Sequence, residues 1–262
     1  MKKLFALILA ALMLFTMAAC GGTADNETTA ADSDLAYIKD KGTLIVGITD
    51  YAPMDFKDEN GEWTGFDAEF ARLAGESLGV AVEFIEIDWD NKFLELKGKT
   101  IDCIWNGMTI TDEALANAAV SNPYVKNAQV VVMAADKLAD YATVESLADL
   151  QFAAEAGSAG EAAINENGLN CTSVLTQADA LQEVKSGAAD ACVIDITMAN
   201  AMTGEGTSYA GLGYSLELTT EEYGIACRQG SDLADALNDI MANLKADGTL
   251  QGLAEKYELT LA

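Results

Sequence analysis

Asp195 is the residue best placed for chemistry, because it directly follows the apolar run Ala189–Ile194. That run predicts a buried strand, and open α/β sheets bind ligands beyond the carboxyl ends of their strands. A carboxylate in that place can pair with a cationic group of a small molecule. It can also cap the predicted helix Ile196–Met202, and the two roles are compatible. Residue 195 is therefore a candidate ligand-binding position.

A second candidate position lies at Gly157 and Ser158, directly before the predicted helix Ala159–Asn165. Free N–H groups in the first turn of a helix attract negative charge, so this turn can bind an anion. A tight turn with a serine cap explains the same pair of residues without a ligand. Both explanations stay open at the level of the sequence.

Composition excludes several functional classes. The chain has 262 residues, of which 42 are acidic, 15 are basic and none is histidine, giving a net charge of −27. Such a chain is repelled by phosphate backbones, so nucleic acid is not expected as a partner. The lack of histidine excludes Ser-His-Asp and Cys-His nucleophile systems and histidine-ligated zinc. Arg72 and Arg228 are the only arginines, so an anion site must use one of them, lysines or backbone N–H groups.

Acidic residues between Lys57 and Glu62 do not form a recognisable cation site. The segment lacks the twelve-residue spacing with a terminal glutamate that calcium loops use. Asn60 and Gly61, which are flanked by aromatic residues, are instead typical of a hairpin turn. We expect neither a metal ion nor another cofactor.

The N-terminus has the layout of an export signal. Two lysines precede an apolar run from Leu4 to Ala19, which is too short to be interpreted first as a transmembrane helix. The run ends in Met17-Ala18-Ala19-Cys20-Gly21, which resembles a bacterial lipobox with Met17 in place of the usual leucine. The resemblance implies that residues 1–19 are a lipoprotein signal peptide and that Cys20 carries the lipid. An ordinary secretory signal is the alternative.

Residues 20–34 follow this signal and are small, polar and acidic, without apolar periodicity. This composition predicts a flexible acidic tether between the lipidated Cys20 and the folded protein. No later apolar run in the sequence is long enough to span a membrane. The protein is therefore expected to be extracytoplasmic and anchored to the cell membrane by lipid.

Four cysteines remain after this segment: Cys103, Cys171, Cys192 and Cys227. An exported protein can form disulfides. Each of these residues, however, lies in or next to an apolar strand-like run, and their spacing matches no metal motif. Buried free thiols are the favoured interpretation, with disulfides as the alternative.

The elements that must position these residues alternate between strands and helices. Apolar residues make up 50% of the chain, which allows a sizeable core. Strands are predicted at 43–48, 80–87, 101–105, 128–134, 151–155, 172–175, 189–194 and 222–228, with a loop over 204–213. Helices are predicted at 65–79, 91–97, 159–165, 177–186, 196–202 and 231–245, with a helical turn at 146–150. Such alternation implies parallel pairing through crossovers, hence α/β sheets, in two units of about 100 residues each.

Several short motifs occur in an order that is more specific than any one of them. They are Gly42–Thr49, Asp50–Met54, Gly65-Phe66-Asp67, Trp89-Asp90, Gly107–Thr111, Ser121–Tyr124, Gly157-Ser158, Glu222–Ala226 and Asp247–Leu250. In this order the chain resembles, over roughly residues 37–257, the extracytoplasmic substrate-binding proteins of amino-acid ABC transporters, family 3. The resemblance implies an α/β fold of two Rossmann-like lobes joined by two hinge strands, with the ligand cleft between the lobes.

By the same resemblance, lobe 1 comprises residues 35–130 plus 226–262, and lobe 2 comprises residues 131–225. The hinge strands would be Ala128–Ala134 and Glu222–Arg228. Proteins of this kind close around a ligand by motion at the hinge.

The resemblance also assigns roles to individual residues. Asp195 matches the acid that binds the α-ammonium group, and Tyr51 and Trp89 match aromatic residues that enclose the ligand side chain. Core packing is the alternative for both aromatic residues. Gly107 and Thr109 match positions whose backbone groups and hydroxyl hold polar groups of the ligand. The candidate ligand-binding residues are therefore Asp50, Tyr51, Trp89, Gly107, Thr109, Gly157, Ser158 and Asp195.

The main departure from the family lies at Ala114, at the end of the run Thr-Asp-Glu-Ala. In the family this position is an arginine that clamps the α-carboxylate in a bidentate pair. Three alternatives remain for the carboxylate. In the first, backbone N–H groups at 157–160 and 107–109 hold the carboxylate. In the second, Lys92 or Lys126 replaces the arginine as a point charge. In the third, the ligand lacks a free carboxylate. All three favour a ligand that carries an ammonium group.

These features predict a non-catalytic, monomeric binding protein that delivers an amino acid or a related ammonium-bearing solute to the membrane permease of an ABC importer. Two alternatives remain. One is an enzyme on the same fold, similar to cyclohexadienyl dehydratase, against which the missing arginine clamp argues. The other is a binder of an amine that lacks a free carboxylate.

Overall fold

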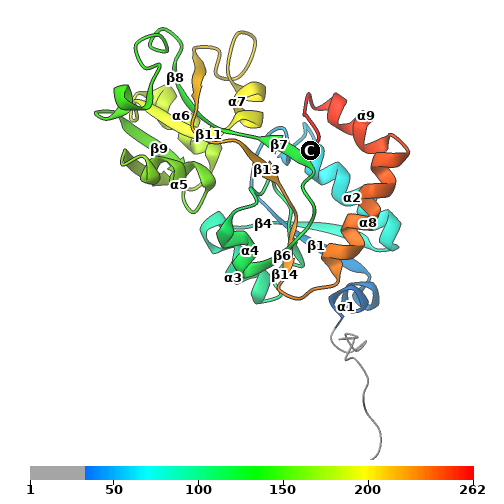
Figure 1. Cartoon of the computed structure of the whole chain (residues 1–262). Helices are drawn as coiled ribbons and strands as arrows, with labels where there is room; N and C mark the ends of the chain where they lie inside the picture. Colours follow the sequence, from blue (N-terminus) through cyan, green and yellow to red (C-terminus); the bar gives the residue numbers. More distant parts are fainter. Residues whose placement is uncertain (1–32) are drawn as a thin grey trace, which may run out of the picture. The chain divides into compact units, whose positions relative to one another are not determined.

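The computed structural model describes residues 33–262, which form one compact unit (Figure 1). The predicted signal peptide 1–19, the predicted lipidation site Cys20 and nearly all of the predicted tether 20–34 lie outside the described residues. Within residues 33–262, no helix is both long enough and apolar enough to cross a membrane. This part of the chain is built on two five-stranded sheets with helices around them.

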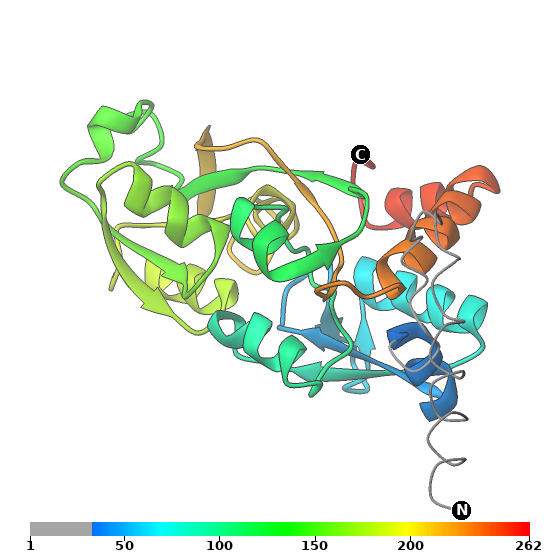
Figure 2. The same ribbon diagram turned by 60° about the horizontal axis from the view of Figure 1, so that its bottom comes forward.

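The first sheet contains strands from both ends of the described chain. Its order is β4 (Ala81–Glu86), β1 (Thr43–Ile48), β5 (Cys103–Ile104), β14 (Ala226–Arg228) and β6 (Ala118–Val120). β1 runs parallel to β4 and β5, whereas β14 runs antiparallel to β5 and β6. Its helices are α1 (Asp34–Lys41), α2 (Phe66–Leu78), α3 (Lys92–Lys97), α4 (Asp112–Asn117), α8 (Leu233–Ala246) and α9 (Thr249–Lys256). The C-terminal helices α8 and α9 return to this sheet and pack against α2 (Figure 2).

Helix α2 shows how the local sequence forms this part of the fold. Phe66, Phe70 and Ala74 are buried and follow one another at the four-residue spacing of one helical face. Gly79 ends the helix in the left-handed conformation that glycine adopts without strain, which agrees with the predicted end of the helix. The hairpin predicted around Asn60 is also confirmed, because β2 (Phe56–Lys57) pairs antiparallel with β3 (Trp63–Thr64).

Asp67, in the first turn of α2, links this helix to the loop that contains Gly107. Its carboxylate is buried and accepts hydrogen bonds from the Gly107 N–H at 2.6 Å and from the Tyr124 hydroxyl at 2.8 Å. These hydrogen bonds go to groups outside α2 and not to the N–H groups of its own first turn. Helix α2 thereby fixes a loop at the edge of the first sheet.

The second sheet has the order β10 (Asn170–Val174), β9 (Gln151–Glu155), β11 (Ala191–Asp195), β8 (Gln129–Ala134) and β12 (Leu212–Glu217). β9 runs parallel to β10 and β11, whereas β8 runs antiparallel to β11 and β12. The elements around it are a 3₁₀ turn at Val144–Leu147, α5 (Ala159–Glu166), α6 (Gln177–Ser186) and α7 (Ile196–Met202). The parallel strands β9 and β11 therefore end at the same edge of the sheet, at Glu155 and Asp195.

The two sheets are connected through the antiparallel pair β7 (Val125–Asn127) and β13 (Glu221–Tyr223) (Figure 1). The sequence prediction placed the hinge strands at 128–134 and 222–228. The structure instead assigns 129–134 to the second sheet as β8, which is buried along almost its whole length, and 226–228 to the first sheet as β14. The apolar run 128–134 is typical of a buried sheet strand, and the structure places it in the second sheet and not at the connection. Residues 222 and 223 of the other predicted hinge strand do belong to β13.

A buried network of ion pairs lies beside the first sheet and is centred on Arg228. Its guanidinium donates to Asp34 at 2.8 Å, to Asp102 at 3.0 Å and to the backbone carbonyl of Ile101 at 2.7 Å. Asp102 also accepts from the ammonium group of Lys41 at 2.6 Å. Arg228 and Asp102 are 7% and 1% exposed, so both charges depend on these partners rather than on water.

The four cysteines of the described chain are free. Cys103, Cys192 and Cys227 are buried, and Cys171 is partly buried. Burial raises the pKa of the Cys171 thiol and, further, that of Cys103. Cys103 and Cys227 lie opposite each other on β5 and β14. The expectation of free thiols within strands is confirmed for the three buried residues, and Cys171 is less buried because β10 is an edge strand.

Candidate functional site

One cavity is lined by residues from both sheets and has a volume of about 40 Å³. The first sheet and its surroundings contribute Trp89, Lys92, Phe93, Asn106, Gly107, Met108, Thr109, Thr111 and Ala114. The second sheet and its helices contribute Gln129, Glu155, Ser158, Ala159, Gln177 and Asp195. A volume of this size holds about three water molecules.

Asp195 lies at the carboxyl end of β11 and is 5% exposed. Its carboxylate accepts hydrogen bonds from the side-chain amides of Asn127, Gln129 and Gln177, the second of these at 2.8 Å. It makes no side-chain capping bond to α7, so the capping role that the sequence allowed is not used here. Three amides from three different elements hold the carboxylate at the cavity wall.

The electrostatic surroundings of Asp195 favour a cation. Burial and, to a smaller extent, the nearby carboxylate of Glu221 together raise the pKa of its carboxyl group to about 7. Asn127 and Gln129 each donate to Glu221 at 2.6 Å as well as to Asp195, so these two acids share the same amide donors. A positive group placed in the cavity would offset both the burial and the repulsion.

Glu155 is a second buried carboxyl group in the cavity wall, and the sequence analysis missed it. It ends β9, is 3% exposed, and its Oε1 has no hydrogen-bond partner among the described residues. Burial raises its pKa to about 8, and Asp195 adds to the shift whereas Lys92 opposes it. The signal was available, because a charged residue that closes an apolar strand in an α/β sheet lies at the edge where ligands bind.

Lys92 is the one cationic side chain among the residues that line the cavity. It is 7% exposed, and its ammonium group donates to the carbonyl oxygens of Trp89 at 3.2 Å and Gly157 at 2.9 Å. The same group lies 4.9 Å from the Trp89 ring centre and 5.1 Å from that of Phe93. Burial lowers its pKa. Of the two lysines that the sequence left open, Lys92 lines the cavity and Lys126 does not.

Neither arginine of the chain lines the cavity. Arg72 donates to the backbone of Trp63, and Arg228 belongs to the buried ion network described above. Ala114 does line the cavity and is 1% exposed, in the first turn of α4. The position where the family carries an arginine therefore faces the cavity with a methyl group.

The N-terminus of α5 contributes Ser158 and Ala159 to the cavity wall. The Ser158 hydroxyl caps the helix by accepting from the Glu161 N–H at 3.1 Å, and Glu161 in turn accepts from the Gly157 N–H at 2.9 Å. A Cβ at Gly157 would lie 2.8 Å from the Asp90 carboxylate, and its φ of 68° also requires glycine. Two groups expected to bind an anion are thus used within the protein, and Ala159, in the first turn of α5, also lines the cavity.

Gly107 and Thr109 line the cavity, but the groups expected to contact a ligand have protein partners. The Gly107 N–H is used by Asp67, and the Thr109 hydroxyl donates to Glu221 at 2.8 Å. A Cβ at Gly107 would lie 2.5 Å from the Tyr51 ring, so only glycine allows this close packing. Both residues shape the wall, and their role here is to hold neighbouring groups in place.

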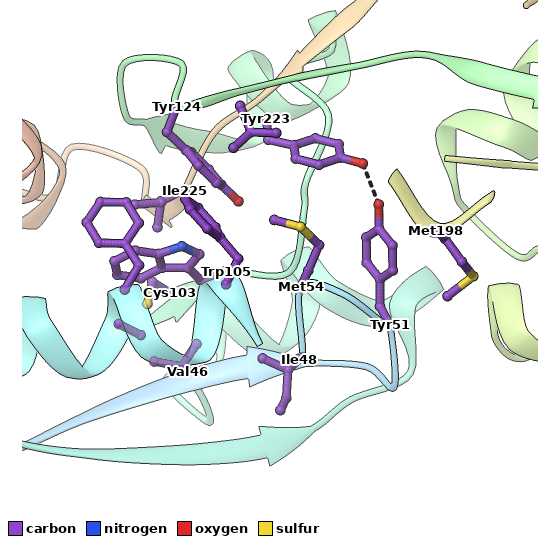
Figure 3. Close-up of a cluster of buried hydrophobic side chains, with 14 of the residues drawn as sticks. Val46, Ile48, Tyr51, Met54, Cys103, Trp105, Tyr124, Met198, Tyr223 and Ile225 are labelled. Carbon is purple, nitrogen blue, oxygen red and sulfur yellow. Dashed lines mark hydrogen bonds between the residues drawn. The ribbon is translucent and has the colours of Figure 1, made fainter. Parts of the chain in front are cut away.

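Tyr51 is 2% exposed and does not line the cavity. Its hydroxyl bonds with those of Thr197 on α7 and Tyr223 on β13, and Figure 3 shows the second of these bonds. This polar contact satisfies the buried hydroxyl and keeps the ring in the core, where the sequence expected a cavity wall. Asp50 is exposed and, like Gly157, lies outside the lining. The aromatic wall is formed by Trp89, as predicted, together with Phe93.

Comparison with known proteins agrees with this architecture. The sequence matches the family model of bacterial extracellular solute-binding proteins, family 3, over residues 44–260. It is 30% identical over 230 residues to the L-cystine-binding protein TcyJ of Escherichia coli strain K12, covering 85% of each chain. It is 27% identical over 267 residues to the arginine-binding extracellular protein ArtP of Bacillus subtilis strain 168, covering 98% of each.

A solved structure shows the same fold. The ancestral amino acid-binding protein AncCDT-1, described as a precursor of cyclohexadienyl dehydratase, matches with a TM-score of 0.79 at 34% identity. The match covers 86% of this chain and 99% of that one. The family match itself includes every residue that lines the cavity and all of both sheets except Thr43, the first residue of β1. The α/β fold and the resemblance inferred from the sequence motifs are confirmed, and the chain belongs to family 3 of the bacterial extracellular solute-binding proteins.

Proposed function

We propose that this protein is the lipid-anchored binding component of an ABC importer, and that its ligand is an amino acid or a related solute with an ammonium group. The observation that carries the proposal is Asp195, a buried carboxylate held by three amides at the wall of a cavity between two sheets. The names of the relatives support the amino-acid class, because they include cystine- and arginine-binding proteins.

In this proposal each part of an amino acid has a partner in the cavity. The ammonium group pairs with Asp195, and Trp89 and Phe93 form an apolar wall for the side chain. The carboxylate takes the remaining N–H of Lys92 and the first-turn amide of Ala159, in place of the arginine that the family has at Ala114. Lys92 offers a point charge without the fixed fork of a guanidinium, so it supplies attraction with less geometric selection.

Closure around the ligand follows from where these residues lie. We propose two lobes, residues 35–130 plus 226–262 and residues 131–225, a division that agrees with the two sheets except at Gln129 and Val130, which belong to the second sheet as part of β8. A ligand that contacts Asp195 from one lobe and Lys92 from the other stabilises the arrangement in which the lobes are close. The lipid anchor at Cys20 is part of the proposal and rests on the lipobox motif.

A thermal-shift panel of amino acids, amines and small peptides tests the proposed function. At 100 times its Kd, a ligand stabilises the folded protein by about 2.7 kcal/mol. For a chain of this size we expect the melting temperature to rise by about 5 to 10 °C. Amines without a carboxylate serve as the comparison, because they keep the Asp195 contact and lose the Lys92 contact. A panel in which no amino acid raises the melting temperature would contradict the proposal.

A dehydratase function is the second candidate, because the AncCDT-1 structure is that of a precursor of cyclohexadienyl dehydratase. Such a substrate needs a firm carboxylate clamp, which Ala114 does not provide. We therefore expect no aromatic product when the protein is incubated with prephenate or arogenate and the ultraviolet absorbance is followed. Appearance of product with turnover would establish the enzyme instead.

A further inference from the structure

We propose that Glu155 is a second cation-binding carboxylate of this cavity and that it selects amino acids with a positively charged side chain. This inference rests on the proposed function, since it concerns the ligand of the same site. The proposed ligand has three charged groups. Its α-ammonium group pairs with Asp195, a second cationic group pairs with Glu155, and its carboxylate pairs with Lys92.

The first support is the missing partner of Glu155. Its side chain is almost fully buried, yet Oε1 has no hydrogen-bond partner among residues 33–262. Buried polar groups in folded proteins nearly always have partners, so one that lacks a partner and lines a cavity calls for a donor from outside. Asp195, at the end of the neighbouring strand β11, differs because three amides already hold it.

The second support is the balance of charge around the cavity. Its titratable lining residues are Glu155, Asp195 and Lys92. With both acids ionised the lining carries a net charge of −1, by the count of two carboxylates and one ammonium group. A neutral amino acid offers ionised Glu155 no counter-charge, so this carboxyl group stays protonated, whereas a cationic side chain cancels the excess charge and allows Glu155 to ionise. Because uncompensated buried charge is costly, the second class binds more favourably.

The third support is the placement of the two acids on the second sheet. β9 and β11 are parallel neighbours, and Glu155 and Asp195 end them at the same edge. Lys92 faces them from the first sheet and rests on the Trp89 and Phe93 rings. Two cationic groups of one ligand would meet the two acids, while its carboxylate would meet the lysine on the opposite side.

Binding of a cationic amino acid should release a proton from Glu155, because burial favours the protonated carboxyl group before the ligand arrives. Burial raises the pKa of Glu155 to about 8, with Asp195, Asp179 and Asp88 adding to the shift and Lys92 opposing it. Near pH 7 the carboxyl group is therefore mostly protonated until a cation arrives, and it loses its proton when the cation binds. The affinity for a cationic amino acid is expected to fall as the pH is lowered from 8.5 to 6.

The test compares wild type, Glu155→Gln and Glu155→Asp by calorimetry with L-arginine, L-lysine, L-glutamine and L-alanine. The wild type should bind L-arginine or L-lysine more tightly than both neutral amino acids. Glu155→Gln should weaken binding of the cationic ligands by about 10- to 100-fold, the range for one hydrogen bond to a charged group. It should change binding of the neutral ligands by less than about threefold, and Glu155→Asp should keep part of the preference. Glu166→Gln is the matched control, because Glu166 is exposed and lies in α5, the helix that Ser158 caps.

Glu155→Gln should also melt no lower than wild type, because it removes a buried acid that is costly to ionise. A loss of affinity with unchanged melting separates ligand contact from misfolding. In different buffers, the proton release that accompanies L-arginine binding should be smaller for Glu155→Gln than for wild type. Equal binding of neutral and cationic amino acids by wild type would overturn the role of Glu155 and leave the proposed function standing. Binding of no amino acid at all would overturn both.

Discussion

The Asp195→Ala variant is expected to lose detectable amino-acid binding while it stays folded. Asp195 is buried, and its carboxylate is the group proposed to pair with the α-ammonium of every ligand. Removing one partner of a buried charge pair costs about 3 to 5 kcal/mol, or roughly 100- to 4,000-fold in affinity. Isothermal calorimetry with the best ligand of the thermal-shift panel measures this directly.

Two features make this experiment decisive. The pKa of Asp195 is raised to about 7, so ionising it in the folded protein is already costly and its removal should not unfold the chain. Asp239→Ala, an exposed aspartate on α8, changes the net charge by the same amount far from the cavity lining and is the matched control. Undiminished affinity in Asp195→Ala would remove the basis of the proposed function.

The Arg228→Met variant is expected to lose about 3 to 5 kcal/mol of folding free energy. Methionine fills much of the space but leaves Asp34 and Asp102 without the guanidinium that now bonds to both. Asp102 is 1% exposed, so water cannot take over this role, and Lys41 remains as its one ion-pair partner. Urea unfolding followed by circular dichroism gives the free energy.

Arg72→Met is the matched control for this change, because it removes the chain's other arginine. Arg72 is exposed and bonds to one backbone carbonyl, so the loss should stay below about 1 kcal/mol. Ligand affinity of the folded Arg228→Met protein should be unchanged, since Arg228 does not line the cavity. Equal losses in the two variants would show that the buried network adds nothing to stability.

Much of the fold follows from local sequence signals. Helix α6 matches its predicted range at both ends, because Thr176 caps its start and Gly187 ends it in the left-handed conformation. β1 and β9 were predicted with the same accuracy from their apolar runs. Strand β12, at 212–217, was missed because its residues alternate between partial burial and exposure at the edge of a sheet.

The site was predicted less completely than the fold, and the reason is tertiary. Asp195, Trp89 and Lys92 were named from the sequence, and all three line the cavity. Tyr51 was expected to line the cavity too. Its hydroxyl instead bonds to partners on α7 and β13 that lie more than 140 residues after it in the sequence, so local sequence does not reveal its position. Glu155 was overlooked because an acid at the end of an apolar strand looks like a solvated strand end until its neighbours are known.

Hydrogen bonds between protein groups and contacts with the ligand should control different properties of binding. Tyr51 bonds to Thr197, and Lys92 bonds to the carbonyl of Gly157, and these bonds join protein groups alone. The Tyr51–Thr197 bond therefore contributes the same free energy to binding of every ligand. Changes to this bond should alter all affinities by the same factor and preserve their order. Changes at Glu155 alter the order itself. Evolution or design can thus adjust the working concentration range of this protein and its choice of cargo separately.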